Sequence, residues 1–100
     1  MTKDTLDKII SSLKDKKINF ALDTHIHDTS CVRGIFIYDA DERKVKEAIG
    51  NGNMKGIKVK KTYLWYLGEK KKALLLKFKN ELFLEIPEVE SYGISSTAVI

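Results

Sequence analysis

Hydrophobic residues recur at helical spacing in two parts of the chain. A 3.6-residue period runs from Leu6 to Leu13, and a shorter one runs from Val45 to Ile49. Gly50 follows the second run and favours a helix stop there. Residues suited to cap the two helices precede the runs: Thr2 or Asp4, and Asp39 or Asp41. The pattern therefore predicts two short amphipathic helices.

Other segments show the alternation or the short apolar runs that are typical of β-strands. The predicted strands cover residues 18–23, 31–38, 57–67, 73–79 and 82–86. Lys79–Asn80–Glu81 is predicted to turn the chain between the last two strands, and Pro87 to end the final one because proline lacks a backbone donor. Residues 88–100 are interpreted either as an additional edge strand or as a loose tail.

The predicted order of elements is α-β-β-α-β-β-β, with short links between them. One hundred residues leave room for one domain, so we expect a single α+β domain over residues 1–100. Because consecutive strands joined by tight turns pair with each other, the sheet should be mostly antiparallel, with both helices on one face.

The strand predicted at residues 57–67 presents different residues on its two faces. One face carries Ile57, Val59, Lys61, Tyr63, Trp65 and Leu67. The other carries Lys58, Lys60, Thr62, Leu64 and Tyr66. Because the first set is the more hydrophobic, we expect Tyr63 and Trp65 to belong to the core. Tyr66 is then the aromatic residue on the lysine-bearing face.

The net charge of +4 hides a strong segregation of charge along the chain. Residues 1–53 hold equal numbers of basic and acidic residues, whereas residues 54–80 hold nine lysines and one glutamate. Residues 81–100 hold four glutamates and no basic residue. Lysines bind phosphate backbones without sequence preference, and aromatic rings among them can stack on bases. The central segment therefore predicts a surface that binds nucleic acid or an acidic protein.

The residues expected to form this surface are Lys55, Lys58, Lys60, Lys61, Lys77 and Lys79, with Tyr66 as the stacking residue. Two other interpretations of the lysines are open. Lysines protect exposed strand edges from pairing with other chains, and the glutamates at 81–90 can neutralise them by cross-strand pairing. The leading hypothesis is a small non-catalytic binding protein, from a virus or mobile element, that uses no cofactor.

His25-Ile26-His27 supports the alternative hypothesis of a nuclease. The tripeptide resembles the motif of HUH endonucleases, in which two histidines flank a hydrophobic residue. The resemblance implies that His25 and His27 hold a divalent metal that polarises the scissile phosphate, while Tyr63 or Tyr66 attacks it. It covers three residues, and the tyrosines lie on a predicted strand whereas the family has them on a helix.

Two histidines can also act without a metal, one as general base and the other as general acid on RNA. The plainest interpretation is that His25 and His27 are surface-loop residues that bind no metal. Cys31, the single cysteine, is expected to be a small buried hydrophobic residue at the start of a strand. Because it has no partner for an intrachain disulfide, we expect a cytoplasmic setting.

A third hypothesis is a protein inhibitor or immunity partner, which would form a homodimer through a sheet edge. It shares with the first hypothesis an electrostatic mode of binding. No segment approaches the roughly 20 apolar residues that a membrane-spanning helix needs. We therefore expect partners in the form of nucleic acid or protein and no interaction with a membrane.

Overall fold

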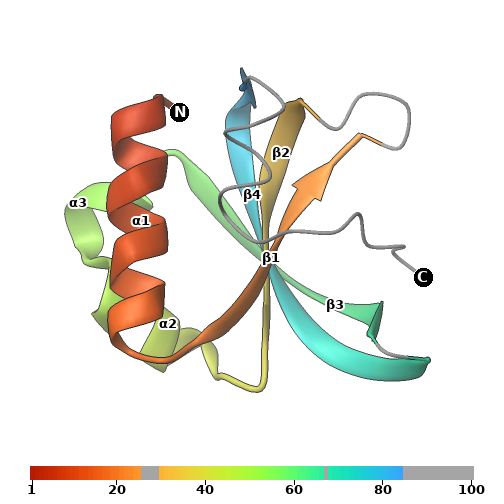
Figure 1. Cartoon of the computed structure of the whole chain (residues 1–100). Coiled ribbons are helices and arrows are strands. Elements are labelled where there is room, and N and C mark those ends of the chain that lie inside the picture. Colours follow the sequence, from red (N-terminus) through yellow and green to blue (C-terminus); the bar gives the residue numbers. More distant parts are fainter. Residues whose placement is uncertain (26–29, 67, 85–100) are drawn as a thin grey trace.

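The computed structural model describes residues 1–25, 30–66 and 68–84, without the side chains of Asn51, Leu64 and Tyr66. Its helices are α1 (Lys3–Asp15), α2 (Glu42–Ile49) and α3 (Asn51–Met54). Its strands are β1 (Asn19–Thr24), β2 (Cys31–Tyr38), β3 (Ile57–Tyr66) and β4 (Glu69–Phe83). The strands form one antiparallel sheet in the order β1-β2-β4-β3 (Figure 1). The predicted α+β class and mostly antiparallel sheet are confirmed.

Both long helices begin at residues that the sequence predicts as caps. The Thr2 hydroxyl oxygen accepts a hydrogen bond from Thr5 N at 3.2 Å. The Asp41 carboxylate accepts one from Lys44 N at 2.7 Å. Such bonds satisfy amide groups that have no partner inside the first turn of a helix, and each cap contributes about 0.5–2 kcal/mol.

The end of α2 is also where the sequence predicts it. Gly50 follows Ile49 with a φ of 86°, a backbone conformation that favours glycine. The residues after Gly50, Asn51–Met54, form the single-turn helix α3, which the sequence pattern did not predict. No helix in the described part of the chain is long and apolar enough to cross a bilayer.

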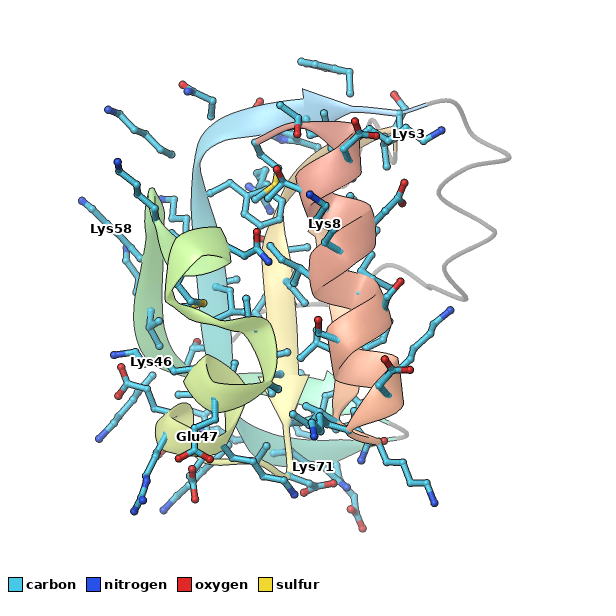
Figure 2. The ribbon with its side chains drawn as sticks, turned by 90° about the vertical axis from the view of Figure 1, so that its left-hand side faces the viewer. Lys3, Lys8, Lys46, Glu47, Lys58 and Lys71 are labelled. Carbon is cyan, nitrogen blue, oxygen red and sulfur yellow. The ribbon has the colours of Figure 1, made fainter. Side chains whose placement is uncertain are left out.

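Helices α1 and α2 lie on the same face of the sheet, which we call the helix-covered face (Figures 1 and 2). The helices contribute Leu6, Ile9, Ile10, Leu13, Val45 and Ile49 to the main core. The strands contribute Leu22, Val32, Ile35, Ile37, Leu74, Leu76 and Phe78. Full burial of an aliphatic side chain contributes about 1.5–3 kcal/mol, so this cluster is the main source of stability. The prediction that both helices pack on one face is confirmed.

The opposite face of the sheet, which we call the second face, carries a smaller buried cluster. Its members are Ala21, Phe36, Tyr38 and Ala73, with Leu75 packed against them. They alternate along β1, β2 and β4 with the residues of the main core, as the pleat of a strand requires. Phe36 is fully buried, so the second face has an apolar centre of its own.

β4 is one strand of 15 residues, where the sequence predicted two strands and a turn. At the expected turn, Lys79–Asn80–Glu81, the pairing with β2 becomes irregular, since Gly34 pairs with Lys77 but Val32 pairs with Leu82. Five residue steps on β4 thus lie opposite two steps on β2, which makes an enlarged β-bulge. The prediction of a turn is wrong because polar residues mark a bulge and a turn equally well.

Gly34 is required at the edge of this bulge. A Cβ atom there would lie 2.5 Å from the carbonyl oxygen of Leu76, in the neighbouring strand β4. That oxygen belongs to paired backbone and cannot move aside cheaply. Only glycine therefore lets β2 and β4 approach each other at this point.

The two halves of β3 differ in what covers them. Ile57 and Val59 pack against the main core, as predicted. Tyr63 and Trp65 are 43% and 49% exposed, so the prediction that they belong to the core is wrong. The end of the β3–β4 hairpin projects away from the helices in Figure 1, and the helices therefore cover only the first part of β3. Alternation fixes the face of a residue but not whether another layer lies over that face.

Candidate functional site

Four lysines of the β3–β4 hairpin lie on the second face of the sheet. Lys58 pairs in register with Lys77, and Lys60 pairs with Leu75 of the second cluster. Residues directly opposite each other in antiparallel strands share a face, and Lys79 follows Lys77 at the strand period of two. All four lysines are exposed, and Figure 2 shows Lys58 extending outward from β3.

Two adjoining pockets bring these four lysines together. The first, of about 400 Å³, is lined by Lys58, Lys60, Lys77 and Lys79 with Gly56, Ile57 and Phe78. The second, of about 470 Å³, shares three of the lysines and adds Asp23, His25, Arg33, Leu75 and Glu81. Because the two pockets have common walls, we treat them as one hollow and call it the basic pocket.

His25, Cys31 and Glu81 form a polar cluster at one side of the basic pocket. The Nε2 atom of His25 lies 3.0 Å from Oε1 of Glu81. The Cys31 thiol donates a hydrogen bond of 3.1 Å to Oε2 of the same carboxylate. Cys31 is buried, as the sequence predicted, whereas the side chains of His25 and Glu81 are 39% and 45% exposed. The cluster thus runs from the protein interior to the pocket.

The carboxylate of Glu81 is held in its charged form by this cluster. Hydrogen bonds from the Cys31 thiol and then from His25 lower its pKa below the ordinary value, although partial desolvation opposes them. A carboxylate accepts hydrogen bonds and cannot donate them when ionised. Glu81 therefore offers a negatively charged acceptor in a pocket whose other carboxylate, Asp23, is paired with Arg33.

Arg33 and Asp23 form a second charged pair beside the cluster. Nη2 of Arg33 lies 3.1 Å from Oδ1 of Asp23, whose side chain is 8% exposed. A buried carboxylate needs such a partner, because an unpaired buried charge is costly. Nε of Arg33 has no acceptor among the described residues. Both residues of the pair line the basic pocket, together with Lys60 and Lys77.

The bulge in β4 is what gathers these residues. It lies opposite Arg33 on β2, and Glu81 is part of it. His25 directly follows β1, and its backbone N–H donates to the carbonyl of Cys31 at 3.2 Å. Leu84 N donates to Ser30 O at 2.8 Å, which holds the end of β4 to the start of β2. Three strand ends therefore converge on the cluster.

The predicted binding lysines do not all lie on one surface. Lys61 pairs in register with Leu74 and so lies on the helix-covered face, where it lines a hollow of about 700 Å³ with Tyr63 and Lys72. Lys55 is exposed between α3 and β3. Tyr66 pairs with Glu69 at the end of the hairpin, but its side chain and the whole of His27 lie outside what the structure describes.

The hairpin lysines are poorly neutralised by acidic groups. Within the described residues, no ion pair involves Lys55, Lys58, Lys60, Lys61, Lys77 or Lys79. Lys71 pairs with Asp39 at 3.7 Å, and Glu81 pairs with His25 in place of a lysine. In α2, by contrast, Arg43 pairs with Glu47 and Lys46 with Glu42. The charge of the hairpin is thus available to an external anion.

Sequence reasoning did not assign Arg33, Cys31 or Glu81 to a site. Glu81 lies 56 residues from His25 and 50 from Cys31 along the chain, whereas Arg33 lies 10 residues from its partner Asp23. The one available signal was that His25, Cys31 and Glu81 each stand at the end of an apolar strand segment, where polar residues gather. No protein-family model, curated protein or solved structure matches the chain.

Proposed function

We propose that the protein binds nucleic acid, with a preference for single strands, along the β3–β4 hairpin. The observation that carries this proposal is a hairpin with lysines on both faces and few acidic partners, next to two exposed aromatic rings, Tyr63 and Trp65. Lysine side chains bind phosphates by releasing counterions, and lysines already paired with carboxylates would have little to offer.

The aromatic residues favour a single strand over a duplex. Tyr63 and Trp65 lie two residues apart on one face of β3, so their rings are spaced by about 6.6 Å along the strand. Bases within a duplex are about 3.4 Å apart and are not accessible to an intervening ring. An unstacked strand can place successive bases on both rings, at about 1–3 kcal/mol each. Lys70 lies over the Tyr63 ring at 4.7 Å and adds positive charge there.

β3 is also the right strand to carry such a ligand. It stands at the edge of the sheet, so a polyanion lying along it reaches the basic pocket on the second face and Lys61 and Lys72 on the other. An acidic protein surface would use the same lysines but has no need of Tyr63 and Trp65. We place the protein in the cytoplasm, because its single cysteine suits a reducing compartment.

Charge reversal tests the proposal. The triple variant Lys58→Glu, Lys60→Glu, Lys77→Glu should lose about 100-fold or more in affinity for labelled single-stranded DNA or RNA, measured by fluorescence anisotropy. The slope of log affinity against log salt concentration should become shallower by about 2, since each of the three lost phosphate contacts on a single strand contributes about 0.7. The matched control is Lys8→Glu, Lys14→Glu, Lys16→Glu, which changes the net charge equally at exposed lysines of α1 and its C-cap.

Three results would contradict the proposal. The unmodified protein could fail to bind any nucleic acid, the two triple variants could lose affinity equally, or duplexes could bind as tightly as single strands. The first of these, combined with binding to acidic proteins, would favour the inhibitor hypothesis. Circular dichroism of each variant confirms that the fold is retained.

A second candidate function is cleavage of RNA, which one contact favours. His25 lines the same pocket as Lys60 and Lys77, and the Glu81 carboxylate lies 3.0 Å from its ring. A histidine oriented by a carboxylate is a recurrent general base, and the lysines would hold the phosphate beside it. His25→Ala should then abolish cleavage of a labelled RNA while leaving its binding within about threefold. Intact RNA after prolonged incubation with the unmodified protein would exclude this function.

A further inference from the structure

His25, Cys31 and Glu81 each direct a potential metal-ligand atom to one place. The imidazole nitrogen, the thiol sulfur and a carboxylate oxygen all lie within 4.8 Å of one another. We propose that these three residues bind one divalent transition-metal ion, and that zinc is the metal that suits them best. The site differs from the histidine pair suggested by the sequence, since its ligands come from the residue after β1, the start of β2 and the bulge of β4.

The donor set favours zinc over the hard cations. Nitrogen, sulfur and oxygen donors are those that zinc takes in proteins, at about 2.0–2.3 Å, whereas magnesium and calcium take oxygen. In a tetrahedral zinc site, these bond lengths place the ligand atoms about 3.3–3.7 Å apart. His25 Nε2 lies 3.0 Å from Oε1 of Glu81, Cys31 Sγ lies 3.1 Å from Oε2, and one ligand atom from each residue lies within 4.8 Å of the other two. Rotation of the half-exposed His25 and Glu81 side chains would bring the three ligand atoms to the tetrahedral spacing.

The change in charge on binding is favourable for a half-buried site. The Cys31 thiol would lose its proton to solvent and become a thiolate, and the His25 ring would carry its proton on Nδ1 so that Nε2 faces the ion. With the Glu81 carboxylate, the two negative charges neutralise the two charges of the metal. The ion thus replaces the thiol proton that now bridges Cys31 and Glu81.

The backbone already holds the three ligands in position. The hydrogen bond from His25 N to Cys31 O joins the first two residues, and the β-bulge holds Glu81 against the start of β2. A site built on paired strands loses little entropy when it closes on an ion. A chance cluster of exposed acidic groups would have no buried member. In this cluster Cys31 is buried.

The fourth coordination position would face the basic pocket. His25 and Glu81 line that pocket, whereas Cys31 is only 2% exposed and lies on the interior side. An ion held by all three residues therefore has its remaining position on the side of Lys60, Lys77 and Lys79. Three protein ligands with one open position are typical of zinc sites that bind or activate a ligand. An anion such as inorganic phosphate is the class of ligand that these lysines would direct there.

Direct titration tests the inference without any nucleic acid, so its outcome is independent of the proposed function. The full chain, kept reduced with a thiol-free reductant and freed of metal with a chelator, is titrated with Zn²⁺ in a calorimeter. A parallel titration uses Co²⁺ and optical absorption. We expect one ion per chain, and a cobalt spectrum with tetrahedral d–d bands and a thiolate-to-cobalt charge-transfer band.

Three variants locate the site. Cys31→Ser should abolish the charge-transfer band. Glu81→Gln should weaken Zn²⁺ binding by about 100-fold, because loss of a ligand costs at least as much as loss of a residue that only hydrogen-bonds to a ligand. Glu69→Gln is the matched control, an exposed glutamate of β4 outside the cluster, and should bind Zn²⁺ as the unmodified chain does. If Cys31→Ser fails to fold, Glu81→Gln decides the matter, because its side chain is half exposed.

Two results would overturn the inference. One is the absence of saturable Zn²⁺ binding by the unmodified chain. The other is binding that Glu81→Gln leaves unchanged, with no charge-transfer band for Co²⁺, which would place the ion elsewhere. A site made by His25 with His27 would give that second result, and His27→Ala would then abolish binding.

Discussion

The two halves of β3 have the same alternation of side chains and opposite surroundings. Val59 packs against the helix-covered core, whereas Tyr63 and Trp65, on the same face, are about half exposed. The difference arises because α1 and α2 cover the first half of the hairpin and the second half extends beyond them (Figure 1). The first half therefore stabilises the fold through its helix-covered face and carries Lys58, Lys60 and Lys77 on its other face, whereas the second half offers exposed apolar rings to a ligand.

The largest expected effect is a loss of stability from a substitution in the packed first half of the hairpin. Leu76 is fully buried and pairs in register with Val59. Leu76→Ala should lower the free energy of unfolding by about 2–5 kcal/mol, because it leaves a cavity among close-packed side chains. Denaturation by urea, followed by circular dichroism, measures the change. A loss below about 1 kcal/mol would show that the first half of the hairpin is not packed as described.

The next largest expected effect is a loss of affinity from a substitution in the exposed second half of the hairpin. Trp65→Ala should reduce affinity for single-stranded nucleic acid by about 1–3 kcal/mol, the contribution of one stacked base. It should change the free energy of unfolding by less than about 1 kcal/mol, since half of the side chain is already in water. Trp65 is the one tryptophan of the chain, so quenching of its fluorescence by the ligand gives a second measurement. Equal destabilisation by Trp65→Ala and Leu76→Ala would remove the distinction between the halves.

The smallest expected effect is on the pH dependence of stability, and it depends on Glu81 of β4. The pKa of Glu81 is lowered by its hydrogen bonds to Cys31 and His25. Its carboxylate therefore stabilises the folded chain above the pKa of about 4.5 that it has when unfolded, and this contribution is lost as the pH falls through the lower folded value. In the presence of a chelator, the difference in Tm between the unmodified chain and Glu81→Gln should shrink below about pH 4.5. A difference that stays constant into acid would contradict this assignment.

Local features of the fold could be predicted from the sequence, because they depend on neighbours along the chain. The caps Thr2 and Asp41 and the stop at Gly50 are of this kind. So is the placement of Lys58 and Lys60 on the face opposite Val59, which follows from the two-residue period of a strand.

Features that depend on distant segments could not be predicted. The exposure of Trp65 depends on where the helices end, which alternation does not encode. The meeting of Glu81 with Cys31, 50 residues away, depends on the register of β4 against β2. The bulge that sets this register was interpreted as a turn, so the site that it builds was out of reach.

The missing side chain at Gly34 has a consequence for how the chain tolerates variation. A methyl group there would push β4 away from β2, and the displacement would reach Lys77, its register partner, and with it the wall of the pocket. In a saturation library selected for ligand binding, this position should therefore keep glycine. Gly52, around which a methyl group would find open space, should accept many residues in the same selection.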